Sequence, residues 1–527
     1  MNILKPPCDE GVIASGKAVS ECQKNRRRWI LAATILGSSM SFIDGTVVNV
    51  ALPALQRELN ASATDVQWVV EAYALFLAAL LLLGGSLGDL FGRRLIYAIG
   101  VAVFALASIW CGVAPNVQQL IIARAIQGVG GALLVPGSLA IISASFPEKD
   151  RGQAIGTWSG ATAITTALGP VLGGWLIEQV SWRAIFFLNL PLALVVLLLV
   201  FRFVPESRDE ENAGKLDLLG AALATIGLGA LVFGLIESAG LGFGNPFVLI
   251  ALIGGAVVLV AFVVVEARRR YPMMPLSLFR AREFAGANLL TLFLYAALSG
   301  TLFFLPLNLI QVQGYSATAA GAAILPFILL MFLLSRWSGG LIKRYGSRLP
   351  LVTGPLIVAI GFALFLRPGV GGSYWTTFFP AVVVLGLGMA VSVAPLTTTV
   401  MNSVSESRAG IASGINNAVS RTAGLLSIAV LGVVMFLSFN ACLDEHLAKM
   451  PISSEVRRMI DTERIKLAAL ELPASVSEET RTAFKQTVND CFVYGFRRVM
   501  LIGVGLALAS SLTAFIMLRG RRSSSSG

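Results

Sequence analysis

The feature that most constrains this chain is a series of fourteen apolar stretches, each long enough to cross a lipid bilayer as a helix. A spanning helix needs roughly 20 mostly apolar residues. Only 13% of the 527 residues are charged, about half of the share found in a soluble domain. The excess apolar surface therefore has to face lipid. The predicted spans lie near residues 29–54, 66–87, 95–113, 119–143, 154–178, 184–203, 216–237, 247–266, 284–310, 317–342, 349–366, 375–400, 409–436 and 492–518.

Basic side chains predict how these spans are oriented. Short loops on the cytoplasmic side of a membrane retain Lys and Arg. With the N-terminus inside, the short outer loops hold only Arg57, Arg183 and Arg367. The net charge of +11 thus reflects basic residues in the predicted cytoplasmic loops, and no nucleic-acid partner is expected. We expect a multi-pass protein of the plasma membrane, in bacteria the inner membrane, with both termini in the cytoplasm.

An internal repeat divides the chain into two related halves. The loop GSLGDLFGRRL at 85–95 returns 254 residues later as GGLIKRYGSRL at 339–349. A second echo joins Gly-Val-Gly at 128–130 to Gly-Leu-Gly at 386–388. Transporters built from such repeats place the substrate path between the halves. The repeats predict an all-α membrane fold of two pseudo-symmetric six-helix bundles with two inserted helices.

This organisation gives five segments with different roles. They are a cytoplasmic tail at 1–28, an N-terminal bundle at 29–204, two inserted linker spans with their cytoplasmic loops at 205–283, a C-terminal bundle at 284–518 that includes an outer loop at 437–491, and a cytoplasmic tail at 519–527.

Three ionisable residues of the first half lie inside predicted spans at positions where charge is costly and by default suggests function. They are Asp44, Glu71 and Arg124. Burial favours the neutral form of a carboxyl group, whereas a nearby guanidinium favours the carboxylate. A carboxyl group moved between two such environments would bind and release a proton. Asp44 could instead be a structural hydrogen-bonding group, Glu71 could be hydrated near the outer surface, and Arg124 could extend towards the headgroups.

Further polar residues recur at helical spacing inside apolar spans. Such stripes line either a contact between helices or a water-filled cavity. We take these residues as substrate-cavity candidates, Arg421 being the only charged one: Gln127, Asn288, Thr291, Tyr295, Asn417 and Arg421.

The predicted fifth span is rich in glycine and contains one proline. Glycines allow close helix approach, and proline permits a bend. The residues concerned are Gly156, Gly160, Gly169, Pro170, Gly173 and Gly174.

The outer loop at 437–491 is flanked by two cysteines, Cys442 and Cys491. On the oxidising side of a membrane such a pair can form a disulfide, and we hypothesise one here. The single histidine, His446, has no metal-type cluster in the sequence around it, so no metal site is expected.

Four ordered motifs together resemble the major facilitator superfamily, in particular its fourteen-span drug–proton antiporter branch. GSLGDLFGRR resembles the signature loop after the second span, and FIDGTVVNVALP at 42–53 resembles the first-span motif. LIIARAIQGVGG at 120–131 and LGPVLGG at 168–174 resemble the motifs of the fourth and fifth spans. The resemblance covers nearly the whole chain.

The resemblance also implies roles for individual residues. Asp89, which lies between Gly85 and Gly92, would form with Arg93 or Arg94 a cytoplasmic charge pair that holds one conformation.

In the same way, Arg124 would assist proton exchange, and Asp44 would be a protonatable or cation-facing carboxyl group. Gly169 and Pro170 would shape the helix that favours export.

We therefore expect a proton-coupled antiporter that exports drugs or other small amphiphilic compounds by alternating access. It would need no cofactor beyond the proton gradient and would act as a monomer on small-molecule substrates within the bilayer. Export of an endogenous metabolite, such as an amino acid, siderophore or antibiotic, remains an alternative. A membrane-embedded enzyme is a third possibility, but it would need clustered catalytic groups, which the sequence does not show. A non-transporting sensor is a fourth, and it would tolerate the loss of Asp44 and Arg124, whereas a transporter would not.

Overall fold

The computed structural model describes residues 18–208, 216–404, 409–450, 452–473 and 475–518, and within these ranges the chain is helical with no β-strand. The helices before the inserted spans are α2 (Ala18–Glu58), α3 (Ala63–Phe91), α4 (Arg93–Val113), α5 (Val117–Ser145), α6 (Glu148–Gln179), α7 (Ala184–Phe187) and α8 (Asn189–Phe203). The inserted helices are α9 (Leu218–Leu241) and α10 (Pro246–Arg268). The remaining elements are η1 (Leu276–Arg280), α11 (Arg282–Leu307), η2 (Asn308–Val312), α12 (Ala317–Ala322), α13 (Leu325–Gly339), α14 (Leu341–Tyr345), α15 (Arg348–Leu364), α16 (Tyr374–Thr377), α17 (Phe379–Asn402), α18 (Ala409–Leu447), α19 (Ser454–Glu463), η4 (Arg464–Ala469) and α20 (Glu478–Met517).

Thirteen stretches of helix in the described ranges are long and apolar enough to cross a membrane. The fourteenth predicted span, at 349–366, corresponds to α15, a shorter apolar helix of 17 residues. Such a helix extends for about 26 Å, slightly less than the apolar layer of roughly 30 Å. The predicted fold class, an all-α membrane protein, is confirmed.

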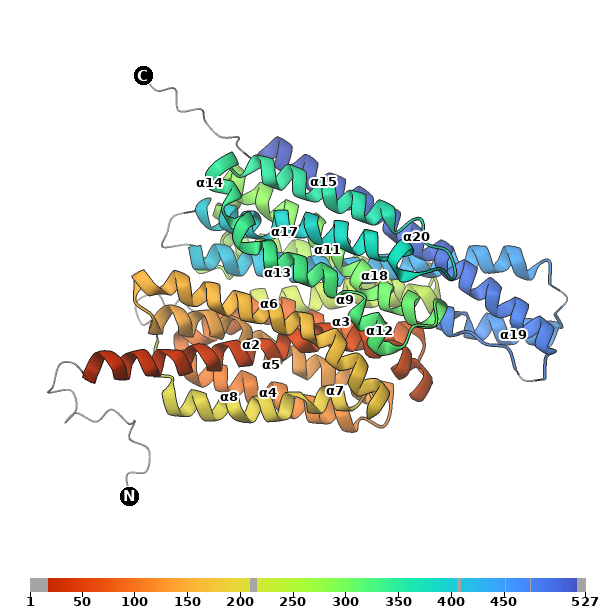
Figure 1. Ribbon diagram of the computed structural model, residues 1–527, viewed down its shortest axis with the longest axis horizontal. Helices are drawn as coiled ribbons and strands as arrows, with labels where there is room; N and C mark the ends of the chain where they lie inside the picture. Colours follow the sequence, from red (N-terminus) through yellow and green to blue (C-terminus); the bar gives the residue numbers. More distant parts are fainter. Residues whose placement is uncertain (1–17, 209–215, 405–408, 451, 474, 519–527) are drawn as a thin grey trace.

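The helices form two bundles, one from each half of the chain (Figure 1). The N-terminal half, α2 to α8, occupies the lower part of the view, and α11 and α13 to α17 occupy the upper part. The short α12 lies lower, against α6. The inserted hairpin, α9 and α10, lies between the halves in sequence, and α9 packs against both α3 and α18. By contrast, only 11% of the most apolar window of α10 is buried, so this helix faces lipid.

Local sequence determines where several helices begin. Ser62 caps α3 by accepting a hydrogen bond from the backbone N–H of Asp65, whose carboxylate accepts from the backbone N–H of Ser62. This reciprocal capping box satisfies two N–H groups that the helix leaves free. Asn116 and Ser477 cap α5 and α20 through their side-chain oxygens. The helices therefore start at polar residues that flank the apolar runs.

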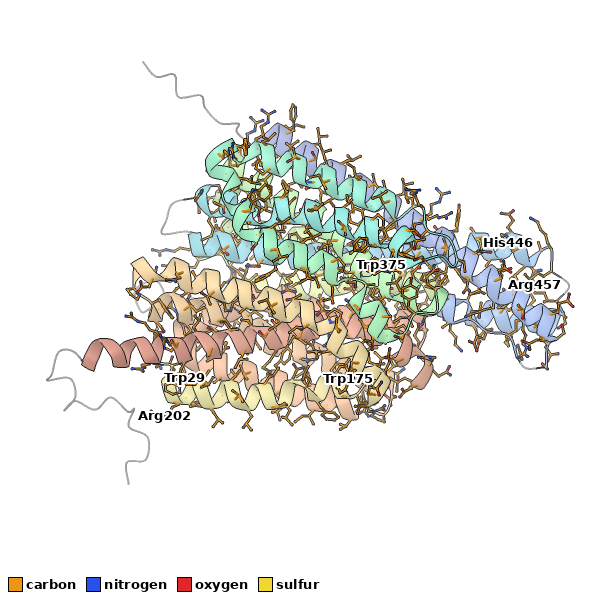
Figure 2. The ribbon with its side chains drawn as sticks, in the orientation of Figure 1. Trp29, Trp175, Arg202, Trp375, His446 and Arg457 are labelled. Atoms are coloured by element: carbon orange, nitrogen blue, oxygen red, sulfur yellow. A yellow bond between two sulfur atoms is a disulfide. The ribbon has the colours of Figure 1, made fainter. Side chains whose placement is uncertain are left out.

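Tryptophans mark the two edges of the membrane region (Figure 2). Trp29 lies towards one end of the molecule, and Trp175 and Trp375 lie towards the other. All three are substantially exposed, as is typical of tryptophans at membrane interfaces. The outer segment, residues 437–491, projects beyond the second edge and carries His446. Here α18 and α20 continue past the predicted spans before α19 connects them.

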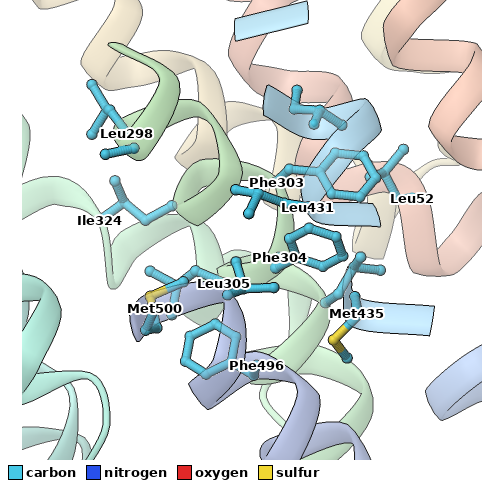
Figure 3. Packing of buried hydrophobic residues seen from close by; sticks show 14 of the residues in the cluster. Leu52, Leu298, Phe303, Phe304, Leu305, Ile324, Leu431, Met435, Phe496 and Met500 are labelled. Carbon is cyan, nitrogen blue, oxygen red and sulfur yellow. The ribbon is translucent and has the colours of Figure 1, made fainter. Parts of the chain in front are cut away.

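The largest apolar core includes side chains from both halves (Figure 3). Phe304, Met435 and Phe496 bring together α11, α18 and α20, and Leu52 of α2 reaches the same cluster. A second core, which contains Tyr97, draws only on residues 30–204.

The predicted terminal tails lie largely outside the described residues. Residues 1–17 and 519–527 are not among them. The first helix begins at Ala18, before the predicted start of the first span at residue 29. The end of the predicted N-terminal tail is therefore a continuation of α2.

Candidate functional site

A buried ion pair lies inside the N-terminal bundle. The Nη1 of Arg124 on α5 donates to Oδ2 of Asp44 on α2, and both side chains are about 1% exposed. Gln127, one turn after Arg124, accepts from Arg124 Nη1 at 2.7 Å and donates to Asp44 Oδ1 at 2.9 Å. Both carboxylate oxygens of Asp44 are thus satisfied, as the burial of a charge requires.

Residues from three further helices hold this pair in place. The Nε of Arg124 donates to the carbonyl oxygen of Val69 at 3.0 Å, and its guanidinium lies 4.3 Å from the centre of the Tyr73 ring. On the other side, Ser108 accepts hydrogen bonds from Gln127 and from Asn189. The sequence analysis did not single out Ser108 or Asn189, although Asn189 interrupts an apolar run.

Glu71 lies in completely different surroundings. Its side chain is fully buried, and neither carboxyl oxygen has a hydrogen-bond partner among the described residues. Gln67, one turn earlier on α3, donates to the carbonyl oxygen of Ile428 on α18 at 3.0 Å. Leu75, one turn later, packs with apolar residues of α9 and α18. Glu71 is therefore enclosed where the two halves and the inserted hairpin meet.

The signature loop, Gly85–Leu95, is fixed to its own half of the protein. Arg93 Nε donates to Asp89 Oδ1 at 2.9 Å, and the backbone N–H of Arg94 donates to Glu206 at 3.0 Å. Gly92 has a φ of +118°, and a Cβ there would lie 2.7 Å from the Glu206 carboxylate. A side chain is therefore excluded at this turn. Glu206, which follows α8, was missed because the sequence does not show what the loop contacts.

The small residues of α6 form two contact faces. Towards α2, a Cβ at Gly169 would meet Thr46, and one at Gly173 would meet Val47. Towards α12, a Cβ at Gly174 would lie 2.5 Å from the carbonyl oxygen of Ala317.

The other positions of this glycine-rich pattern differ. Pro170 contributes the carbonyl oxygen against which Gly321 of α12 packs, whereas a Cβ at Gly156 would have no neighbour within 4 Å. A Cβ at Gly160 would have only the ring of Phe332 nearby, at 3.9 Å. Among these glycines, the ones that approach the other half closely therefore lie towards the C-terminal end of α6.

Two polar contacts also join the halves at this outer end. Gln311 Nε2 donates to Gln56 Oε1 at 2.6 Å. The backbone and hydroxyl of Thr318 both donate to the Glu178 carboxylate at 2.7 Å. Sequence reasoning predicted neither contact, because each partner alone is an ordinary loop-flanking polar residue.

The polar stripe of α11 has two buried members that contact α18 and one partly buried member. Asn288 and Thr291 are buried, and both accept hydrogen bonds from Asn416 of α18 at 3.2 and 2.7 Å. Tyr295 is only partly buried. Asn288 and Thr291 therefore serve the contact between α11 and α18, one of the two alternatives for such a stripe.

On α18, Asn417 is exposed and Arg421 is half-buried. The guanidinium of Arg421 lies 5.7 Å from the centre of the Phe42 ring of α2, in the other half.

The outer segment covers a cavity of about 670 Å³. Pro53 and Glu178 of the N-terminal half line it, together with Gln311 of the C-terminal half and Lys466 and Lys485 of the outer segment and α20. The outer segment thus lies over the opening between the two halves at this end of the molecule.

A disulfide joins the two long helices that carry the outer segment. Cys442 and Cys491 are bonded, with their Cα atoms 5.4 Å apart. His446 Nδ1 lies 3.9 Å from Cys442 Sγ. Since both sulfurs belong to the disulfide, neither offers a thiolate to a metal ion.

Comparisons with known proteins agree with this architecture. A sequence model of the Major Facilitator Superfamily matches residues 34–428. The multidrug resistance protein Stp of Mycobacterium tuberculosis is 38% identical over 425 residues, which cover 80% of this chain and 78% of Stp. The puromycin resistance protein pur8 of Streptomyces alboniger is 37% identical over 425 residues, covering 80% and 84%.

Among solved structures, a bacterial homolog of the human lysosomal transporter Spinster, described as inward-facing and unoccupied, has a TM-score of 0.65. It is 19% identical, and the match covers 93% of this chain and 97% of that one. At this identity the likeness concerns the fold alone.

Proposed function

The chain belongs to the Major Facilitator Superfamily and is a membrane transporter, and from this premise we propose that it is a proton-coupled antiporter that exports drugs or other small amphiphilic compounds. Its relatives include proteins named for multidrug and puromycin resistance. We further propose that it acts as a monomer in the bacterial inner membrane, with both termini in the cytoplasm and no cofactor.

The observation that carries this proposal is the contrast between two buried carboxyl groups. Asp44 is ion-paired with Arg124, whereas Glu71 has no partner among the described residues. A carboxylate beside a guanidinium is stable without a proton, but a carboxylate with no partner in apolar surroundings is very costly. A proton on Glu71 removes the cost of the charge. The two groups therefore suit opposite protonation states in one conformation.

Coupling follows if the rocking of the halves exchanges these environments. Glu71 is enclosed only while α3, α9 and α18 remain together, so separation of α3 from α18 would admit water and allow the proton to leave. Arg124 would then control the charge of Asp44 as its contacts with Val69 and Gln127 change. An exchange of this kind ties proton movement to conformation.

Contacts between the halves support a proposal about which transport conformation the structure represents. The outer end is closed by Gly174 against α12, by Gln56 with Gln311, and by Glu178 with Thr318. The signature loop makes its ion pair, Asp89 with Arg93, within the N-terminal half. We propose that this is the inward-facing state, and that Asp89 exchanges partners when the inner end closes.

Transport in proteoliposomes with an imposed pH gradient tests the proposed function. A panel of anionic and cationic dyes should be moved by the wild-type protein only while the gradient exists, and a proton ionophore should stop the movement. Asp44→Asn should abolish proton-driven movement while leaving membrane insertion intact. Asp461→Asn, an exposed acid-to-amide change on the outer segment, serves as the matched control. Unchanged gradient-driven efflux in the Asp44→Asn variant would remove Asp44 from the coupling role.

A further inference from the structure

The charges deep in the membrane region are not equivalent in what they can offer to a substrate. Asp44 and Arg124 neutralise each other inside the N-terminal bundle and are each about 1% exposed. Glu71 is fully buried where α3, α9 and α18 meet. None of these three side chains is open to a ligand between the halves. Arg421 is different.

Arg421 lies twelve residues, about 18 Å, from the start of α18 at Ala409. Its side chain is half-buried and has no ion-pair partner among the described residues. Its guanidinium lies 5.7 Å from the centre of the Phe42 ring on α2. The charge therefore points across the boundary between the halves.

The surroundings of this guanidinium are open on both helices. Gly45, one turn from Phe42 on α2, is exposed, and a Cβ there would have no neighbour within 4 Å. Asn417, one turn before Arg421 on α18, is exposed as well. These open positions therefore lie one turn from each member of the Phe42–Arg421 contact between the halves.

Aromatic groups adjoin the same space. The Phe42 ring packs edge-on against Trp158 of α6, with 6.4 Å between the ring centres. Tyr295 of α11 is partly buried and lies within electrostatic range of Arg421. Trp158 itself is buried, whereas Phe42 is partly exposed. A planar ring could therefore lie against Phe42 while its charged substituent reaches the guanidinium.

We propose that Arg421 selects the charge of the substrate, and that the transported compounds are aromatic amphiphiles carrying a carboxylate or another anionic group. The proposal rests on the proposed transport function and names its substrate class. A guanidinium presents N–H donors in a fork that matches a carboxylate. Because Arg421 has no ion-pair partner among the described residues, its charge is available to attract an anion and to repel a cation.

Equilibrium binding to the purified protein in lipid nanodiscs, without a gradient, tests the inference. The probes are 5-carboxyfluorescein, an aromatic anion, and ethidium, an aromatic cation. The wild-type protein should bind the anion at least about tenfold more tightly than the cation, and Arg421→Gln should weaken anion binding by a similar factor. Arg421→Lys should retain part of the affinity, because it keeps the charge but loses the fork.

Arg498→Gln is the matched control. Arg498 is an exposed arginine of α20 that donates to the Tyr494 hydroxyl at 2.7 Å, away from the space between the halves. This substitution should leave both affinities unchanged. If Arg421→Gln does not fold, Arg421→Lys and the anion-to-cation ratio of the wild-type protein decide the question.

Two results would overturn the inference: ethidium binding as tightly as the anion, or anion binding that Arg421→Gln leaves intact. Gradient-driven transport of both dyes, measured in parallel, separates this failure from failure of the proposed function. Ethidium export that needs the gradient and ignores Arg421 would uphold the antiporter and reject the anion site. Anion binding through Arg421 without gradient-driven transport of either dye would uphold the anion site and reject the antiporter.

Discussion

Asp44 and Arg124 illustrate how much a single residue's position can reveal. Their depth in apolar runs predicted that each had a task, but sequence could not show that they contact each other, because they lie on different helices. Gln127 was expected to line the cavity and instead bonds both of them. Helical spacing identifies a shared face but not the neighbour that this face meets.

The pairing leads to a stability prediction. Asp44→Asn leaves the buried Arg124 charge without its counter-ion and should destabilise the protein by about 3 kcal/mol. Adding Arg124→Gln removes that charge, so the double variant should recover part of the loss without recovering transport. Thermal unfolding of the two single variants and the double variant in detergent measures the coupling. Strictly additive losses would contradict a direct pair.

Glu71 gives the opposite expectation, because neither of its carboxyl oxygens has a hydrogen-bond partner among the residues that the structure describes. Glu71→Leu should leave stability unchanged or raise it by about 1 to 2 kcal/mol, since an unsatisfied polar group leaves the interior. The same variant should lose the dependence of efflux on the pH gradient. Thermal unfolding and efflux with and without a gradient provide the two readings. A loss of more than about 2 kcal/mol would indicate that Glu71 makes a stabilising contact.

At the scale of helices, sequence predicted the existence of the elements well and their ends less well. Each predicted span corresponds to an apolar helix, since length and hydropathy are local properties. The ends of α18 and α20 extend past the predicted spans because polar residues there still favour helix outside lipid. The glycines of α6 were noted as a pattern, but their division between α2 and α12 depends on packing.

The contact of α6 with α12 can be tested by adding one methyl group. A Cβ at Gly174 would lie 2.5 Å from a backbone oxygen of α12, so Gly174→Ala should push the outer ends apart at a cost of about 1 to 3 kcal/mol. A cysteine introduced as Gln311→Cys should then react several times faster with a membrane-impermeant maleimide.

Gly254→Ala on α10 is the matched control, since nothing lies within 4 Å of a Cβ there. Equal labelling in the Gly174→Ala and Gly254→Ala backgrounds would mean that this glycine does not hold the outer end closed.

At the scale of the whole molecule, the repeat of the signature loop predicted two related bundles and an insertion. The membership in the Major Facilitator Superfamily drug-efflux branch, expected from four motifs, is confirmed. Sequence could not predict that the outer segment lies over the opening between the halves. The residues that line the cavity with it, such as Pro53 and Gln311, are distant along the chain.

The disulfide should stabilise the folded structure of the outer segment, residues 437–491. Cys442 and Cys491 are 49 residues apart, and closing a loop of that length contributes up to about 4 kcal/mol. Cys442→Ser should therefore make the outer segment much more sensitive to trypsin added from outside, whereas Cys111→Ser should not. Peptide mass analysis without reductant reports the bond directly. Absence of the linked peptide would contradict it.

The inserted hairpin makes the two flanks of the transporter unequal. Two bundles that rock against each other have two seams along which they meet, here α3 with α18 and α6 with α12 and α13. On the first seam, α9 lies across the joint, and Trp68 of α3 bonds Glu237 of α9 at 2.9 Å. In the part of the chain that the structure describes, no inserted helix lies across the second seam. We therefore expect a compound dissolved in the bilayer to enter between the halves along α6, α12 and α13.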